Sequence, residues 1–79
     1  MNINDIESKV ADIIGDIVLT KVEPDTLLID SGLVDSLSAV DVVLAVEREF
    51  GCKIPPSEID VYLQSVHTLA AFIAEQKGL

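Results

Sequence analysis

With 79 residues, 49% of them apolar and only Phe50, Tyr62 and Phe72 aromatic, the chain suffices for one small domain, 1–79, with an aliphatic core and no deep catalytic pocket. Fourteen Asp and Glu against five Lys and Arg give a net charge of −9, which disfavours binding to nucleic acid or anionic membranes and favours basic protein surfaces, although solubility alone would also explain it. The start does not resemble a signal peptide and no run of about 18 apolar residues could span a membrane, so we expect a cytoplasmic monomer.

The first segment has the periodicity of a helix. Its apolar residues are spaced along one helical face: Ile3, Ile6, Val10, Ile13, Ile14 and Ile17. A strand is disfavoured because a period of two would put Asp5 and Glu7 on the buried face beside Ile3. Asn2 or Asn4 can cap this helix, since Asn accepts hydrogen bonds from the unpaired N–H groups of a first turn.

A long connection follows, from Thr20 to Asp35. It contains Pro24 and Gly32, which favour turns, and also the apolar residues Leu27, Leu28, Ile29 and Leu33. We expect these apolar side chains to pack back onto the helices. A long ordered loop in so small a domain is often functional.

The second periodic segment begins after Asp35 and predicts a helix that ends at Gly51, because glycine favours helix C-termini. Its expected inner face consists of Leu37, Val40, Val43, Leu44, Glu47 and Phe50, widened by Val42 and Val46. Its expected outer face consists of Ser38, Asp41, Ala45 and Arg48.

The remainder predicts two more helices. Pro55-Pro56 breaks the chain, after which Ser57–Asp60 can begin a short helix. The last helix is expected from about Leu69 to Lys77, with Thr68 as its cap and Gly78 at its end. Since no strand pair is predicted, the fold is expected to be all-α: a small four-helix bundle with three longer helices, one short helix and a long first loop.

Ser36 lies at the start of the second helix. Gly32 allows a tight turn before it, and Asp35 can cap the helix by accepting amide hydrogen bonds. Leu33 and Leu37 bracket Ser36 and are expected to anchor the turn in the core. The hydroxyl would point outward at the positive end of the helix dipole, which suits a phosphate ester better than an enzymatic nucleophile. An Asp-Ser pair can also simply begin a helix, so these residues alone assign no function.

A longer pattern carries a family resemblance. Asp30-Ser-Gly-Leu-Val-Asp-Ser-Leu37 is followed by Val40-Asp41, by Glu47-Arg-Glu-Phe50-Gly51 and by Ile54-Pro55. This frame resembles the acyl carrier protein family, including the peptidyl and D-alanyl carriers that share its fold. The resemblance extends over roughly Ile3 to Glu75, and the combined pattern is far more specific than Asp-Ser-Leu alone.

The resemblance implies a carrier and not an enzyme. A phosphopantetheinyl transferase would attach 4′-phosphopantetheine from coenzyme A to Ser36, and Asp35 would help to bind the magnesium ion in that complex. The arm would tether an acyl or aminoacyl group as a thioester for fatty-acid, polyketide or other specialised acyl metabolism. Loading ligases or synthases with basic docking surfaces would be the further partners. The residues expected to be recognised by partners are Leu37, Val40, Asp41 and Glu47.

Some residues depart from the fatty-acid type of carrier. Ser38 occupies a place where those carriers often have an acidic residue, and Arg48 interrupts the acidic pair near the helix end. Val34 before Asp35, and the segment Ser57–Asp60, are similar to D-alanyl and other specialised carriers. Two alternatives therefore remain: a D-alanyl or aminoacyl carrier loaded by an adenylating ligase, and, in a different class, an unmodified acidic helical adaptor.

The other reactive side chains predict no catalytic residue and no metal site. His67 and Cys52 are the only residues of their types, so neither a triad nor a disulfide is expected. We expect His67 on the surface just before the last helix, and Cys52 as a packing residue. A bundle of this kind can also open between its helices to shelter an aliphatic chain, with Val40, Leu44 and Ile59 as candidate lining residues.

Overall fold

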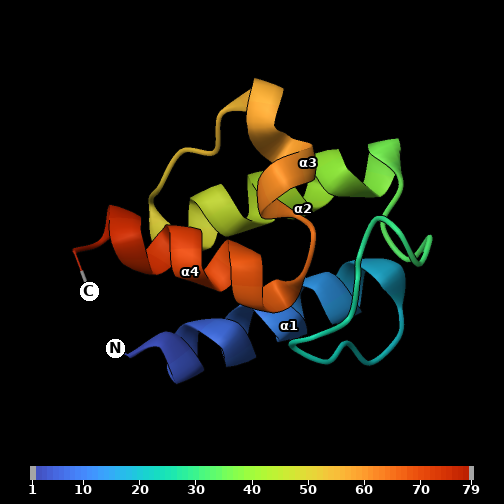
Figure 1. The fold of residues 1–79 in the computed structure, drawn as a ribbon, viewed down its shortest axis with the longest axis horizontal. Coiled ribbons are helices and arrows are strands. Elements are labelled where there is room, and N and C mark those ends of the chain that lie inside the picture. Colours follow the sequence, from blue (N-terminus) through green and yellow to red (C-terminus); the bar gives the residue numbers. More distant parts are fainter. Residues whose placement is uncertain (1, 79) are drawn as a thin grey trace.

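The computed structural model describes residues 2–78, and the helices of this part of the chain follow the expected order. They are α1 (Ile3–Val18), α2 (Ser36–Phe50), the short 3-10 turn η1 (Pro56–Glu58), α3 (Ile59–Tyr62) and α4 (Val66–Gln76). Residues 2–78 contain no strand. The all-α prediction of three longer helices, one short helix and a long first loop is therefore confirmed (Figure 1).

Helix α1 begins at a capping box. The side chain of Asn2 accepts a hydrogen bond from the backbone N–H of Asp5 at 3.0 Å, and the Asp5 carboxylate accepts one from the N–H of Asn2 at 3.4 Å. The predicted inner face is buried at its centre, where Ile6, Val10 and Ile14 are fully enclosed. Ile3 lies at the end of this face and is 37% exposed, because the neighbouring helices do not cover the first turn completely.

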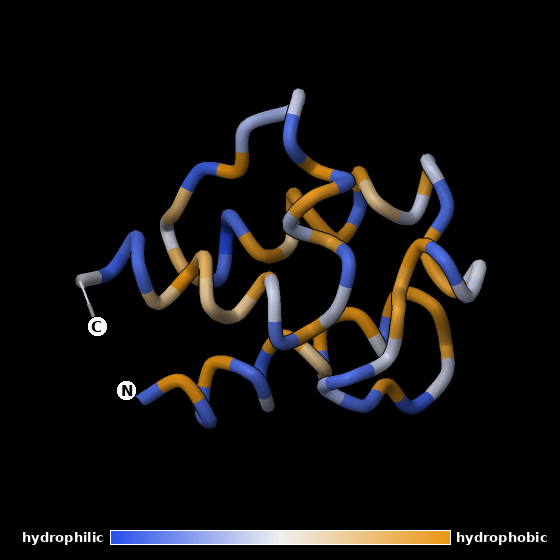
Figure 2. Tube along the Cα trace, in the orientation of Figure 1, coloured by the Kyte–Doolittle hydropathy of each residue, from blue (hydrophilic) through white to orange (hydrophobic). Residues whose placement is uncertain are grey.

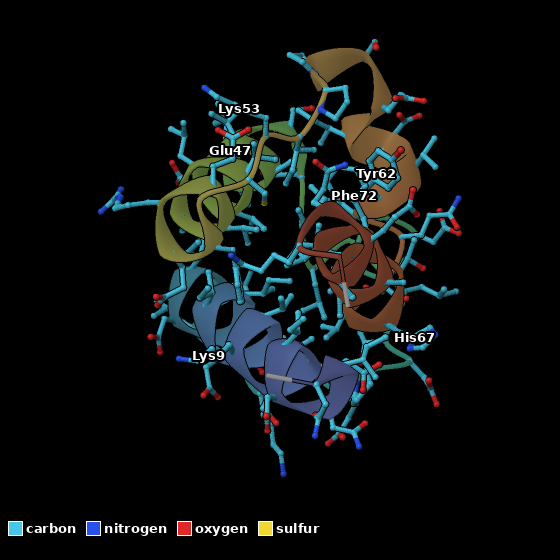
Figure 3. The ribbon with its side chains drawn as sticks, turned by 90° about the vertical axis from the view of Figure 1, so that its left-hand side faces the viewer. Lys9, Glu47, Lys53, Tyr62, His67 and Phe72 are labelled. Atoms are coloured by element: carbon cyan, nitrogen blue, oxygen red, sulfur yellow. The ribbon has the colours of Figure 1, made fainter. Side chains whose placement is uncertain are left out.

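The core lies where α1 packs against both α2 and α4. Figure 2 shows apolar residues recurring along each of these helices, and Figure 3 shows the side chains of the bundle converging between them. Tyr62 of α3 packs on Phe72 of α4 with ring centroids 4.1 Å apart, which fastens the short helix to the bundle. No polar or charged side chain is buried among the described residues, so apolar burial and shape hold the helices together.

Helix α4 begins three residues earlier than the sequence predicts. Ser65, not Thr68, is its N-cap, because the Ser65 hydroxyl accepts a hydrogen bond from the backbone N–H of Thr68 at 3.1 Å. The prediction of a start near Leu69 is therefore wrong. His67 consequently lies inside the first turn of α4 and not before it, where its ring Nδ1 is hydrogen-bonded to the carboxylate of Glu7 on α1.

The first loop is fixed to the rest of the bundle by backbone hydrogen bonds. The N–H of Leu28 donates to the carbonyl of Gln64 at 2.9 Å, and the N–H of His67 donates to the carbonyl of Pro24 at 3.1 Å. Of the four apolar loop residues expected to pack inward, Leu28 is buried and Leu33 is partly buried, and Val22 and Val34 are buried as well. Leu27 and Ile29 remain 54% and 36% exposed, so the expectation that the apolar residues pack inward holds only in part.

Candidate functional site

The start of α2 presents Ser36 to solvent on a fixed turn. Asp35 is the N-cap, in extended conformation, and its Oδ1 accepts a hydrogen bond from the backbone N–H of Ser38 at 2.9 Å, as predicted. This N–H is also the main reason that the pKa of the Asp35 carboxyl lies below its usual value. Ser36 is the first residue of the helix and is exposed. An ionised carboxylate and an exposed hydroxyl therefore stand side by side at the positive end of a helix.

The turn before Ser36 is anchored by a residue that the sequence reasoning did not assign. Gly32 has a φ of 83°, the left-handed conformation that glycine adopts easily, and so permits the chain to reverse. Val34 is 1% exposed and fixes the turn in the core, whereas Leu33 is partly buried and Leu37 is 81% exposed. The prediction that Leu37 anchors the turn is therefore wrong, and the same prediction for Leu33 holds only in part. Val34 and Ala39, the N′ and N4 positions of α2, are both buried, and this apolar pairing is the signal that could have identified the anchor.

The inner face of α2 agrees with the prediction only in part. Its buried residues are Ala39, Val42, Val43, Val46 and Phe50, and all of these except Ala39 were predicted to be inside. Leu37, Val40 and Leu44 were expected inside, but 81%, 51% and 53% of their surfaces are exposed. The exposed Asp41 shares this outer side. Of the residues expected to be recognised by partners, Leu37, Val40 and Asp41 thus lie together on the accessible side of the helix that begins with Ser36.

Glu47 is placed differently from the other three expected recognition residues. Its Oε2 accepts a hydrogen bond from the backbone N–H of Ile54 at 2.8 Å, and the side chain is partly buried. The carboxylate is therefore engaged with the segment that follows α2 and is not free on the outer face. The sequence gives only the spacing of Glu47 and Ile54, seven residues apart, and no sequence pattern predicts a hydrogen bond between them.

A groove of about 510 Å³ opens beside Ser36. One side consists of α2 and the turn before it, including Ser36, Ala39 and Val40; the other side includes Pro56 and Ile59. Val40 and Ile59 line this groove as the sequence suggested, but Leu44 does not. Apart from Asp35, Asp60 and Ser36 itself, the side chains around it are apolar, so the groove can accept an aliphatic group.

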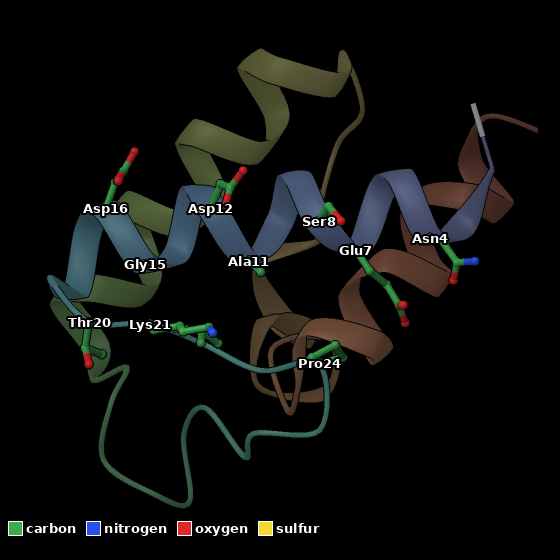
Figure 4. Close-up of a pocket in the computed structure, with 11 residues that line it drawn as sticks. Asn4, Glu7, Ser8, Ala11, Asp12, Gly15, Asp16, Thr20, Lys21 and Pro24 are labelled. Atoms are coloured by element: carbon green, nitrogen blue, oxygen red, sulfur yellow. The ribbon is translucent and has the colours of Figure 1, made fainter.

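A larger hollow of about 660 Å³ lies along α1, away from these residues (Figure 4). Its lining includes Glu7, Asp12 and Asp16, with Lys21 on the loop opposite. The carboxylates make it unsuitable for an aliphatic chain. Within residues 2–78 no three His, Cys, Asp or Glu side chains are grouped so that they could hold a metal ion.

Neither Cys52 nor His67 forms a catalytic arrangement. Cys52 is buried, and burial raises the pKa of its thiol, with a further contribution from the negative charge of Glu47. The thiol is therefore a packing group, as expected. The ring of His67 is exposed, and the side-chain partner that it contacts is the carboxylate of Glu7, not a hydroxyl or a thiol. Among the described helices, none is both long and apolar enough to cross a membrane.

The structure thus brings together an exposed serine, the capped start of a helix and an apolar groove. Comparison with known families shows to which class the protein belongs. The model of the family described as "Phosphopantetheine attachment site" matches residues 4–73, and the chain belongs to this family.

Individual relatives support the same assignment. The chain is 37% identical to the acyl carrier protein of Akkermansia muciniphila, over 99% of this chain and 100% of that protein. It is 32% identical to the acyl carrier protein of Solidesulfovibrio magneticus, over 92% of this chain and 96% of that protein. It is also 30% identical to the D-alanyl carrier protein of Bacillus subtilis, over 71% of this chain and 76% of that protein.

The protein is therefore a phosphopantetheine-bearing carrier and not an enzyme. The residues present fit that cofactor. Ser36 offers an exposed hydroxyl at a helix N-terminus, which suits a phosphate, and Ser36 also lines the apolar groove. Carriers of this family interact with phosphopantetheinyl transferases and with the enzymes that load them.

Proposed function

We propose that Ser36 carries the 4′-phosphopantetheine arm. The observation that carries this proposal is the position of Ser36: it is exposed, it is the first residue of α2, and it borders the apolar groove. The partial positive charge of the helix N-terminus would stabilise the negative phosphodiester at this position. When bound, the arm supplies a terminal thiol that holds the cargo as a thioester.

We assign to Asp35 a supporting role in the attachment reaction. Its carboxylate is exposed and its orientation is fixed by the 2.9 Å hydrogen bond from the N–H of Ser38. Like an aspartate of ordinary pKa it is ionised at neutral pH, and its lowered pKa keeps it ionised to a lower pH. An oriented carboxylate next to the reacting hydroxyl suits the binding of a magnesium ion within the complex with the transferase.

The cargo that the groove favours is an aliphatic acyl group. A groove of about 510 Å³ is within the range of sites for small organic ligands, about 300–1,000 Å³. Val40 and Ile59 would contact such a chain while its thioester end remains near Ser36. A D-alanyl group, loaded by an adenylating ligase, remains the alternative and would leave most of the groove unused.

The accessible side of α2 is our proposed recognition surface, consisting of Leu37, Val40 and Asp41. Two large exposed apolar side chains next to a carboxylate fit an apolar docking site that is flanked by Lys or Arg on the transferase or loading enzyme. We further propose that residues 1–79 act as one carrier domain, in the cytoplasm and as a monomer, since a carrier has to dissociate from one enzyme to reach the next.

The attachment site is tested by intact mass. The protein is incubated with coenzyme A and a broad-specificity phosphopantetheinyl transferase, and we expect a gain equal to one phosphopantetheine. Ser36→Ala should abolish the gain, while Ser8→Ala, which removes an exposed hydroxyl from α1, should preserve it. A folded protein that gains no mass would instead support the unmodified acidic adaptor. Retention of the gain in Ser36→Ala would assign the attachment to another residue.

The recognition surface is tested by the rate of that loading reaction. Asp41→Lys should slow loading more than Asp12→Lys, which makes the same charge change on the exposed side of α1. Added salt should slow loading of the unaltered protein, because exposed charges are screened over about 10 Å at 0.1 M. If the two variants load at the same rate, α2 is not the recognition surface.

A further inference from the structure

The side chain of Glu47 crosses from α2 to the chain segment that follows it. Its Oε2 accepts the hydrogen bond from the backbone N–H of Ile54 at 2.8 Å, and Ile54 is itself 3% exposed. Figure 3 shows Glu47 where α2 and this segment run side by side. Burial of the Ile54 side chain and the bond to its N–H together fix the middle of the segment against α2.

Two prolines connect this fixed point to the groove beside Ser36. Pro55 has a φ of −61° and Pro56, which lines the groove, has its φ restricted by its ring. The N–H of Glu58 donates to the carbonyl of Pro55 at 3.0 Å and closes the η1 turn. Because this short link has few free dihedral angles, a shift at Ile54 would be passed on to Pro56 and would not be absorbed within the chain.

The two sides of the groove belong to different parts of the bundle. Ala39 and Val40 are on α2, whereas Pro56 and Ile59 come from η1 and α3. Helix α3 packs mainly against α4, so its main helix contact does not tie it to α2. The segment that Glu47 holds is therefore the direct chain connection between the two sides, and the packing of Tyr62 on Phe72 holds α3 to α4.

We propose that Glu47 is a positioning residue that sets the separation between α2 and α3, and thereby how well the groove shelters a long aliphatic chain carried at Ser36. The inference depends on the proposed attachment at Ser36 for its consequence, but not for the contact itself. A Gln at this position keeps an amide oxygen that can accept from Ile54, though without the charge that strengthens the bond. An Ala removes the acceptor.

The contact is tested first in the unmodified protein by amide hydrogen exchange. We expect Glu47→Ala to accelerate exchange at Ile54 and in 57–60 by about ten-fold, because it removes a hydrogen bond to a charged group. Glu47→Gln only weakens that bond and should accelerate exchange by less. Glu49→Ala removes the same charge from an exposed position of α2 and should leave these amides unchanged. Ser65→Ala removes the N-cap of α4 and serves as a control for general destabilisation.

The consequence is tested on protein that carries either an acetyl or an octanoyl thioester on the arm. Hydroxylamine attacks the thioester carbonyl, forms the hydroxamic acid and releases the thiol of the arm. We expect Glu47→Ala to accelerate cleavage of the octanoyl thioester about three-fold or more, and Glu47→Gln to accelerate it by less. Neither variant should change the cleavage rate of the acetyl thioester, because an acetyl group is too short to use the groove. Ser65→Ala should change neither rate under conditions where all variants are folded.

Each outcome decides the proposal. Unchanged exchange at Ile54 in Glu47→Ala would refute the contact, whether or not the arm can be attached. Faster exchange with equal cleavage rates for octanoyl in Glu47→Ala and the unaltered protein would refute the sheltering role. If acetyl and octanoyl were accelerated equally, Glu47 would only stabilise the fold. Failure of the unaltered protein to accept the arm would overturn the proposed attachment and, with it, the sheltering role, while the exchange measurement would still decide the contact.

Discussion

Val34 and Leu37 lie on either side of Ser36, but Val34 is buried and Leu37 is exposed. Val34→Ala should therefore lower the stability of the fold, whereas Leu37→Ala should mainly weaken recognition by partners. Val34→Ala removes two carbons from a side chain that is 1% exposed. At about 0.8 kcal/mol per buried carbon, plus a contribution from the cavity left behind, unfolding should become easier by about 2 kcal/mol. Leu37→Ala removes three carbons, but the side chain is 81% exposed, so its loss should cost about 0.5 kcal/mol or less.

Urea unfolding followed by circular dichroism at the helical band measures both losses, provided that the denaturant slope m is unchanged. In a domain of this size, Val34→Ala should lower the melting temperature by about 8–16 °C and Leu37→Ala by only a few degrees. At a temperature where both variants are folded, Leu37→Ala should load the arm more slowly than Val34→Ala. If Leu37→Ala destabilised the protein as much as Val34→Ala, Leu37 would be an anchor of the turn, and our reading of α2 would be refuted.

Three further predictions concern other parts of the molecule. Ser65→Ala should destabilise the protein by about 1 kcal/mol in urea unfolding, more than Thr68→Ala, because Ser65 is the N-cap of α4; the reverse order would mean that the helix begins later. Cys52 should react with iodoacetamide far more slowly in the folded than in the urea-unfolded protein, since its thiol is buried and its pKa is raised; equal rates would contradict its packing role. The pKa of Asp35 is lower in the folded than in the unfolded protein, so its stabilising contribution is present above the unfolded value of about 3.9 and is lost as the pH falls through the folded value. Below about pH 4, unfolding free energy should therefore decrease more steeply in the unaltered protein than in Asp35→Asn, with Asp41→Asn as the control, and parallel curves would contradict the role of the cap.

Local signals in the sequence predicted much of the fold. The period of α1, the cap at Asp35 and the stop at Gly51 depend on residues close together in the chain, and the structure confirms all three. The start of α4 was missed because Ser65 and Thr68 are both good cap residues. The choice between them depends on the hydrogen bond that Ser65 makes, which the sequence does not display.

The predicted inner face of α2 was partly wrong for a different reason. The helix carries apolar residues on more than one face, so the stripe through Leu37, Val40 and Leu44 and the stripe through Val42 and Val46 both have helical spacing. Periodicity cannot say which stripe faces the rest of the bundle, because that is decided by packing against α1. The stripe through Leu37, Val40 and Leu44 is left exposed on the helix that begins with Ser36, and it contains two residues of the proposed recognition surface.

The two backbone bonds that tie the first loop to the start of α4 have a consequence for biosynthesis. Leu28 is bonded to Gln64, and Pro24 to His67, so the loop that leads into Ser36 is completed by residues made some forty positions later. Such distant pairings form only after the intervening chain has been brought together, which costs loop-closure entropy. A chain still emerging from the ribosome would carry the Asp35-Ser36 pair without the frame around it. The modification proposed for Ser36 should therefore follow synthesis of the last helix and should not accompany translation of the site itself.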